Sequence, residues 1–329
     1  AMPAYLKHGG ALDAMKRAFP KAETPWIDLS TGINPWPYPV RDIEASHLPT
    51  KAAHDACRKA MAADFGSNAA ATLPTPGSSI IISLLPHILS AKSVAIMAPT
   101  YGDYARAWSK SAVRNVYALS EPADILIVCR PNNPDGRVIP RDDLIEALKR
   151  QRRRDGWLIV DEAYMDLTPQ DSLASLAGQD NLIVLRSFGK FYGLAGMRLG
   201  ALLAPRTVLQ EMSTLLGEWP ISAPALQVGV AAYTDPAWQA ATQLRLASAR
   251  ARLDPILEDN GLFVVGGTDL FRYAATENAM ALWQRLGNAG ISIRRFDWTE
   301  RYVRIGLPPD QSAEQRLADA LMQEDCLLD

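Results

Sequence analysis

The chain has 329 residues, of which 48% are hydrophobic, so it is long enough to bury a large core. Its 34 basic and 36 acidic residues give a formal net charge of −2, which argues against nucleic acid or anionic membranes as partners. The longest apolar run, 80–89, is about half the length of a membrane span, and Cys57, Cys129 and Cys326 have neither metal-ligand nor disulfide-framework spacing. We therefore expect a cytoplasmic globular protein with no metal site.

The first element with a chemical implication is a predicted helix that begins in "PGSSIIISLL". Gly77, Ser78 and Ser79 lie at its start, where free backbone N–H groups and the helix dipole favour an anion such as phosphate. Taken alone, the Gly-Ser pair is more typical of an ordinary helix cap. The phosphate interpretation therefore depends on residues elsewhere in the chain.

From about residue 94 to 204, short β-rich runs alternate with helical stretches, and the runs are "VAIMAP", "DILIVCRP", "WLIVDEAY", "NLIVLRSFG" and "LGALLAP". Continuous apolar runs are typical of strands that are covered on both faces of a mostly parallel sheet. Between two of them, "DDLIEALKRQRRRDG" predicts a helix with Leu144, Ile145 and Leu148 on one face. The pattern predicts a three-layer α/β/α fold.

The C-terminal third predicts a smaller α+β unit. "WQAATQLRLASARARLDPILEDNG" predicts a long helix, and "DLFRYAAT", "ISIRRF" and "YVRIGLP" predict strands. In "SAEQRLADALMQED", Ser312 and Gln315 have capping-box spacing for a last helix. We expect residues 1–40 to form an N-terminal arm and part of a small domain, 41–240 a large cofactor-binding domain, and 241–329 the C-terminal small domain.

Polar and aromatic side chains follow four of the predicted parallel strands. In chain order they are Tyr101, then Asn132 and Asn133, then Asp161 and Tyr164, then Ser187 and Lys190. Ligands of open parallel sheets bind outside the carboxyl ends of the strands, so we expect these side chains to share one crevice. Each could instead be a helix cap, a turn former or a packing residue, but their order at successive strand ends favours a shared site.

This set of residue types matches the needs of pyridoxal phosphate (PLP). A lysine amine can form a Schiff base with its aldehyde, and a carboxylate can keep its ring nitrogen protonated. An amide and a phenol can hydrogen-bond the ring oxygen, and an aromatic side chain can stack on the ring. The helix start at Gly77–Ser79, together with Ser187 and Arg198, could hold the phosphate.

Three motifs, "RPNNPDG", "DEAY" and "SFGKFYGLAGMRLG", make the chain resemble the fold type I PLP enzymes of the class I/II aminotransferase superfamily. The resemblance implies that Lys190 is the Schiff-base lysine, Asp161 the pyridinium partner, and Asn133 and Tyr164 the ring-oxygen ligands. It implies that Tyr101 stacks on the ring. It assigns the phosphate to Ser78, Ser187 and Arg198, and the substrate α-carboxylate to Arg304 in "YVRIGLP".

A narrower resemblance is to the L-threonine-O-3-phosphate decarboxylases of cobalamin biosynthesis, relatives of the histidinol-phosphate aminotransferases. It is carried by "KHGGALDAMKRAFP", "WIDLSTGINPWPYP", "RSFGKFYGLAGMRLG", "VVGGTDLFR" and "RIGLP". It implies a small phosphorylated amino-acid substrate, with His8, Gly9, Gly10 and Asn34 near it. His8 could equally be a surface residue of the N-terminal arm.

Two questions stay open at this level. The PLP residues serve both decarboxylation and transamination, because the outcome depends on which Cα bond stands perpendicular to the ring. The substrate phosphate has several candidate ligands: His8, Arg106, and Arg294 or Arg295. The resemblance also implies a homodimer with active sites at the subunit interface, although Leu48 stands where many relatives have a tyrosine that reaches the partner's cofactor.

Overall fold

The computed structural model of the protein describes residues 2–323 and divides them into two compact units. Of the described residues, the large unit comprises 37–133 and 137–240, and the small unit comprises 2–36, 134–136 and 241–323. The segment 134–136 thus belongs to the small unit, although it lies inside the range 41–240 that the sequence assigns to the large domain. In the described part of the chain, every helix is too short or too polar to cross a bilayer.

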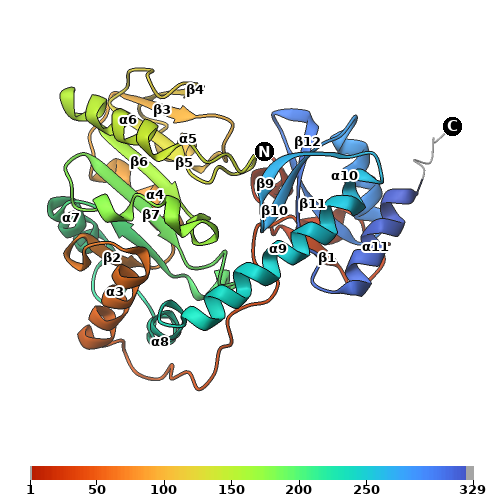
Figure 1. The fold of residues 1–329 in the computed structure, drawn as a ribbon, viewed down its shortest axis with the longest axis horizontal. Coiled ribbons are helices and arrows are strands. Elements are labelled where there is room, and N and C mark those ends of the chain that lie inside the picture. The colour runs from red at the N-terminus through yellow and green to blue at the C-terminus, as the bar shows by residue number, and fades with distance from the viewer. Residues whose placement is uncertain (1, 324–329) are drawn as a thin grey trace. The chain divides into compact units, whose positions relative to one another are not determined.

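The large unit is built on a mixed, mostly parallel sheet (Figure 1). Its strands, in spatial order, are β2 (Thr72–Thr75), β8 (Gly200–Leu203), β7 (Leu182–Ser187), β6 (Trp157–Glu162), β5 (Ile125–Cys129), β3 (Ser93–Met97) and β4 (Ala112–Val116). The pairs from β7 to β4 are parallel, whereas β8 runs antiparallel to β7 and β2. This arrangement confirms the predicted α/β fold class.

Helices cover both faces of this sheet. They are α3 (Lys51–Phe65), α4 (Ser79–Leu84), α5 (Asp103–Ala107), α6 (Arg141–Arg153), α7 (Arg206–Leu216) and α8 (Ala223–Tyr233). The main core lies between one face and helices α4, α5 and α7, and its centre is formed by Ile82, Tyr104, Ile127, Ile159 and Met212. In α6, Leu144 and Leu148 are buried as predicted but Ile145 is half-buried, because Gln151 and Ala147 complete the buried face instead.

The small unit contains a second sheet, with the strand order β1 (Ile27–Leu29), β11 (Ile291–Phe296), β12 (Thr299–Gly306), β10 (Phe271–Ala275) and β9 (Phe263–Thr268). Only the β1–β11 pair among these neighbours is parallel in the described residues. Its helices are α1 (Ala4–Lys7), α2 (Leu12–Ala18), α10 (Ala279–Asn288) and α11 (Gln311–Met322), while α9 (Pro236–Glu258) begins in the large unit.

Two expectations about local structure need correction or completion. Helix α11 is capped by Asp310, whose side chain accepts a hydrogen bond from the Ala313 N–H, so the predicted cap at Ser312 is wrong. Cys57 and Cys129 are buried and form no disulfide, and Cys326 lies outside the described residues. Strands β1, β2, β4 and β9 are additional to those that the sequence predicts.

Candidate active site

The carboxyl ends of β3, β5, β6 and β7 lie at the same edge of the large sheet, because these strands are parallel neighbours. The loops that follow them are joined by direct hydrogen bonds. Asn132 Nδ2 donates to the Pro99 carbonyl at 2.5 Å, which links the loop after β5 to the loop after β3. The sheet therefore brings the strand-end residues into one region of the large unit, as the sequence predicts.

Asp161 is the buried carboxylate of this region, with a 1% exposed side chain at the end of β6. Its Oδ2 accepts hydrogen bonds from the hydroxyls of Tyr104, at 2.9 Å, and Tyr101, and its Oδ1 accepts one from the Ala163 N–H at 3.0 Å. Burial raises the pKa of Asp161, while these three donors and the positive charge of Lys190 act in the opposite direction. A cation placed beside Asp161 would therefore be strongly favoured.

Tyr101 contacts Asp161 through its hydroxyl, a contact that a residue acting only by ring stacking would not need. Its hydroxyl is bonded to Asp161, and its ring lies tilted against the Tyr104 ring at 5.7 Å between centroids. Burial and the neighbouring Asp161 charge raise the pKa of both phenols, so both remain hydrogen-bond donors at neutral pH. Stacking of Tyr101 on a cofactor ring stays a prediction.

Lys190 lies in the loop after β7, partly exposed to solvent. Its Nζ is 5.9 Å from the centroid of the Tyr164 ring, and its positive charge acts to lower the pKa of Asp161. The preceding Gly189 approaches Ala195 closely, since a Cβ at this position would lie 2.8 Å from the Ala195 Cα. Asn133, half-buried in the loop after β5, completes the set of predicted ring contacts.

The predicted phosphate ligands come together at the same edge of the sheet. Gly77 has φ +88°, and a Cβ there would lie 2.7 Å from Arg198 Nη2, which donates to Ser79 Oγ at 3.1 Å. Gly200 pairs with Ser187 in the β7–β8 ladder, and a Cβ on Gly200 would lie 2.7 Å from the Ser78 N. Glycines thus let Arg198 and β8 approach the turn at Gly77–Ser79 closely, at positions where a larger residue would clash.

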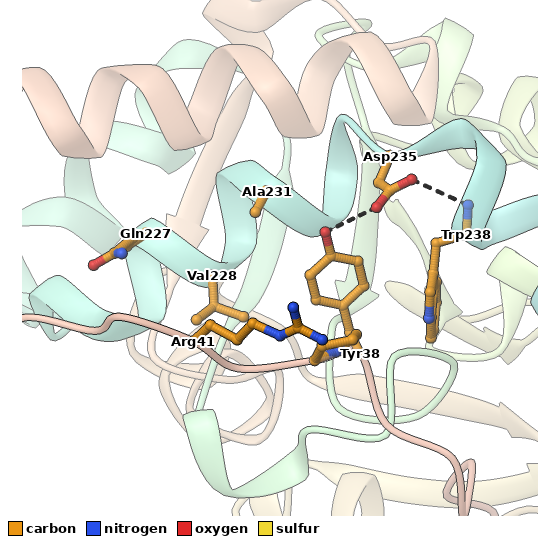
Figure 2. A pocket seen from close by; sticks show the side chains of 8 residues that line it. Tyr38, Arg41, Gln227, Val228, Ala231, Asp235 and Trp238 are labelled. Atoms are coloured by element: carbon orange, nitrogen blue, oxygen red, sulfur yellow. Dashed lines mark hydrogen bonds between the residues drawn. The ribbon is translucent and has the colours of Figure 1, made fainter.

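The Lys190 loop is supported from behind by aromatic side chains. Tyr192 stacks on Trp238 with 5.5 Å between ring centroids, and its carbonyl accepts a hydrogen bond from the Tyr38 N–H. Figure 2 shows the Tyr38 side chain rising to Asp235 at the turn between α8 and α9, where the two form a 2.9 Å hydrogen bond. Tyr38, Asp235 and Trp238 border a pocket of about 380 Å³, and none of the predicted site residues lines it.

The predicted substrate residues belong to the small unit. Arg304 is 5% exposed, and its Nη2 donates to the Ser30 carbonyl at 2.6 Å. A Cβ on Gly9 would lie 2.0 Å from the same carbonyl and 3.1 Å from Arg304 Nη2. Only glycine at position 9 therefore lets the N-terminal arm pack this closely against Ser30. His8 is exposed, and Asn34 is buried with its Oδ1 accepting from the Trp36 N–H at 2.8 Å. Asn34 therefore shapes the turn, and its contact with substrate stays a prediction.

Several candidate ligands of a substrate phosphate have other partners. Arg294 donates to the carbonyls of Tyr5, Leu6 and Lys7, so it caps the C-terminus of α1. Arg295 lies 4.9 Å from the Trp283 ring centroid and 3.7 Å from Glu300, whereas Arg106 pairs with Asp103. Leu48 is 64% exposed in the segment before α3.

Residues 42–321 match the family of class I and II aminotransferases. The chain belongs to this family. The family is PLP-dependent, so the prediction of PLP as the cofactor and the resemblance to this superfamily are both confirmed.

Curated relatives in this aminotransferase family extend over almost the whole chain. A threonine-phosphate decarboxylase from Sinorhizobium sp is 41% identical over 97% of this chain and 98% of its own, and one from Pseudomonas aeruginosa is 39% identical over 96% and 97%. Among solved structures, a histidinol-phosphate aminotransferase from Sinorhizobium meliloti in complex with pyridoxal-5'-phosphate superposes with a TM-score of 0.80 at 20% identity, over 94% of this chain and 93% of its own. At that identity the structural likeness shows the fold alone.

Two residues near this family's predicted site were missed by the sequence analysis. Tyr104, in the first turn of α5, shares the Asp161 carboxylate with Tyr101, and a second tyrosine three residues after Tyr101 is a signal that could have been used. Arg186 is fully buried immediately before Ser187. A charged residue inside an otherwise apolar strand is the signal for Arg186, since an unpaired charge would be too costly there.

Proposed function

We propose that this protein is a PLP-dependent lyase that converts L-threonine O-3-phosphate into (R)-1-amino-2-propanol phosphate and carbon dioxide. The observation that carries this proposal is the 41% identity, over 97% of the chain, to a threonine-phosphate decarboxylase. The second decarboxylase, at 39% identity over 96% of the chain, supports the same substrate. The alternative is an aminotransferase of the histidinol-phosphate type that uses 2-oxoglutarate.

The residues of the large unit fit PLP by their chemistry. Bound PLP supplies a conjugated ring that accepts electrons from a bond broken at the substrate Cα. Lys190 would hold the cofactor covalently, and the buried Asp161 would keep its ring nitrogen protonated. Arg198 and the Gly77–Ser79 turn would hold its phosphate, with Ser187 beside them. Asn133 and Tyr164 would contact its ring oxygen, and these roles are proposals for this chain.

The substrate would be oriented by residues of the small unit. Arg304 presents a planar guanidinium suited to a bidentate contact with the α-carboxylate, and its bond to the Ser30 carbonyl fixes the plane of the guanidinium. His8, Gly9 and Asn34 would lie near the substrate. The choice between decarboxylation and transamination is made by this orientation, because the PLP residues favour neither reaction.

We also propose a pathway, a cellular compartment and an oligomeric state for this protein. The product is an amino-alcohol phosphate, and we place the reaction in cobalamin biosynthesis, in the cytoplasm. We further propose a homodimer with active sites at the subunit interface. Analytical ultracentrifugation of the PLP-loaded protein would test the dimer, which a species of the mass of one chain would refute.

The reaction is tested by incubating the PLP-loaded protein with L-threonine O-3-phosphate and measuring carbon dioxide and the amine product. We expect both to form in equal amounts without 2-oxoglutarate. Conversion of histidinol phosphate that depends on 2-oxoglutarate, with no carbon dioxide from threonine phosphate, would instead establish the aminotransferase. A Lys190→Ala variant should lose both the visible absorbance of the bound cofactor and the activity, and retention of both would refute the role of Lys190.

A further inference from the structure

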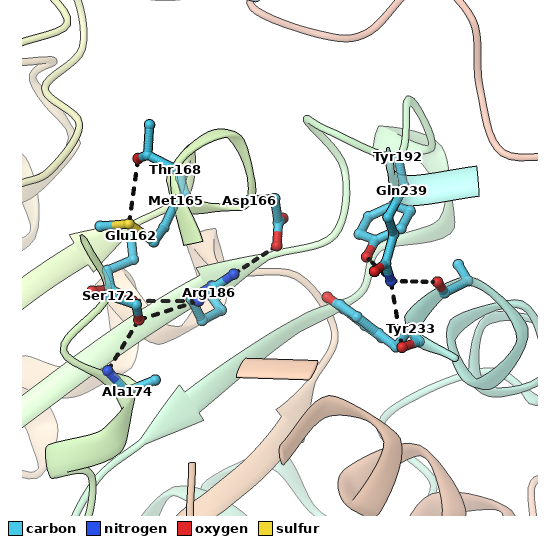
Figure 3. A network of polar contacts seen from close by, with 12 residues as sticks. Glu162, Met165, Asp166, Thr168, Ser172, Ala174, Arg186, Tyr192, Tyr233 and Gln239 are labelled. Atoms are coloured by element: carbon cyan, nitrogen blue, oxygen red, sulfur yellow. Dashed lines mark hydrogen bonds and ion pairs between the residues drawn. The ribbon is translucent and has the colours of Figure 1, made fainter. Parts of the chain in front are cut away.

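A buried ionic cluster lies behind the candidate active site, and the proposed reaction leaves it without a role. Arg186, Glu162 and Asp166 are its charged members, with exposed fractions of 2%, 0% and 6%. Figure 3 shows Arg186 between the two acids, with Tyr192, Tyr233 and Gln239 in a neighbouring group. All of these residues belong to the large unit.

Strand register explains why Arg186 reaches these acids. Glu162 and Arg186 are direct partners in the β6–β7 ladder, one residue beyond the Asp161–Leu185 pair. Because side chains alternate along a strand, Arg186 and Glu162 point to the face opposite Asp161. On that face the Arg186 guanidinium also packs over the Phe65 ring of α3, at 4.2 Å from its centroid.

The guanidinium contacts the chain at two places close to candidate catalytic residues. Arg186 Nη1 is 3.5 Å from Glu162, the residue after Asp161, and Nη2 is 2.6 Å from Asp166, two residues after Tyr164. Glu162 is fixed further by a 2.6 Å hydrogen bond from Ser172 Oγ and a 2.8 Å bond from the Leu173 N–H. The segment 162–166, which contains Tyr164 and directly follows Asp161, is therefore held at both ends by one side chain of the strand that leads to Lys190.

The geometry points to Arg186 as a positioning residue: it fixes Asp161 and Tyr164 relative to Ser187, on the strand that carries Arg186 itself, and to Lys190 in the loop that follows this strand. This inference rests on the proposed binding of PLP by those four residues. Arg186 itself faces away from them and would touch neither cofactor nor substrate.

The charges of the cluster favour an arginine over any other residue at this position. Burial raises the pKa of both Glu162 and Asp166, and the positive charge of Arg186 opposes that rise in each case. A guanidinium is permanently charged and can bond two carboxylates in fixed directions, whereas a lysine ammonium offers a single centre. Lysine at position 186 would keep the charge but lose the simultaneous contact with both ends of the segment.

The test compares Arg186→Lys and Asp166→Asn with wild type, each loaded with PLP. The first readout needs no substrate: the pH titration of the visible absorbance of bound PLP. A displaced Asp161 would leave the ring nitrogen less protonated and the lysine adduct more basic, so we expect the midpoint to rise by about one unit. The second readout is kcat per bound PLP, which we expect to fall about 100-fold, because a displacement of about 1 Å costs this much.

Arg272→Lys is the matched control. Arg272 forms a 2.8 Å ion pair with Asp254 and is 13% exposed, but it lies in the small unit, outside the cluster. We expect this control to keep the wild-type absorbance titration and kcat per bound PLP. If Arg186→Lys or Asp166→Asn also keeps both while its melting temperature falls, Arg186 serves stability alone and the inference is wrong. If Arg186→Lys does not fold, Asp166→Asn decides the question.

Failure of the proposed reaction can be told apart from failure of this inference. A wild-type protein that binds PLP but releases no carbon dioxide from threonine phosphate would refute the substrate. The absorbance titration would still decide the role of Arg186, because it depends only on cofactor binding.

Discussion

Asp64 is a half-buried acid next to the buried ionic cluster. Burial is the largest cause that raises its pKa, to about 7, and the negative charge of Asp166 adds to the effect, while Arg186 and a hydrogen bond from Gln239 oppose it. Native Asp64 therefore retains a proton that the unfolded chain releases near its ordinary pKa of about 4. Its stabilising contribution is complete below pH 4 and is lost as pH rises through 7.

We predict that Asp64→Asn becomes more stable relative to wild type as pH increases. Between pH 5 and pH 8 the variant should gain on the order of 1 kcal/mol, less than the full pKa shift implies, because Asp64 keeps some contact with solvent. Urea unfolding at the two pH values measures this gain. Asp259→Asn, at an exposed position, is the control. An Asp64→Asn effect that is the same at pH 5 and pH 8 would contradict the assignment.

At the residue scale, the sequence predicts the positions of the candidate residues better than it predicts the contacts that these residues make. Asp161 and Lys190 stand directly after strand-like runs, so their positions follow from the ends of parallel strands. Arg198 is brought to Gly77 by a backbone with φ +52°, which no pattern of residue types specifies. The bond from Tyr101 to Asp161 depends on side-chain conformation and could not be predicted from the sequence.

Helix α11 provides a prediction at the scale of elements. The spacing of Ser312 and Gln315 fits a capping box, but Gln315 Nε2 donates to Asp319 and the cap is made by Asp310 Oδ1, 2.8 Å from the Ala313 N. Asp310→Ala should therefore destabilise the protein by about 1 kcal/mol, the usual value of an N-cap. Thermal unfolding of the variant measures this loss.

Ser312→Ala is the matched control for this cap. Ser312 lies inside α11 at an exposed position, where alanine has the higher helix propensity, so the melting temperature should be unchanged or slightly higher. A larger loss in Ser312→Ala than in Asp310→Ala would restore the capping box that the sequence predicts. The two signals lie two residues apart, and only the backbone conformation of Asp310 distinguishes them.

The sequence predicts the inner strands of both sheets and misses the edge strands β1, β2, β4 and β9. All residues of β5 and β7 are buried, and the sequence shows β5 as an unbroken apolar run and β7 as four apolar residues followed by Arg186 and Ser187. The edge strand β4 has a single fully buried residue, Val116, and the edge strand β9 exposes Phe263 and Val265 and contains two glycines. Edge strands depend on pairing with a neighbour, which a local pattern does not record.

At the scale of the whole molecule, the predicted functional residues divide between the two units. The candidate cofactor residues, from Gly77 to Arg198, lie in the large unit, and His8, Asn34 and Arg304 lie in the small unit. The sequence predicts a large and a small domain from the change in element pattern. It does not predict that the segment 134–136 joins the small unit, where Gly267 N–H bonds the Asp135 carbonyl at 2.8 Å, because that contact is distant in sequence.

This division predicts that cofactor and substrate affinity can be changed separately. Arg198→Lys should raise the dissociation constant of PLP, and Arg304→Lys should raise KM for threonine phosphate, each by roughly tenfold or more, because each loses a charge-assisted hydrogen bond. PLP affinity is measured by fluorescence titration of the cofactor-free protein, and KM with saturating PLP. Each variant serves as the control for the other, since both exchange arginine for lysine.

The two variants should separate the measurements because Arg198 contacts Gly77 and Ser79 of the large unit, whereas Arg304 contacts Ser30 of the small unit. Saturating PLP should therefore restore Arg198→Lys toward wild-type KM but leave the KM of Arg304→Lys high. Loss of PLP affinity in Arg304→Lys equal to that in Arg198→Lys would show that the small unit also holds the cofactor. In that case the assignment of cofactor binding to the large unit alone would be wrong.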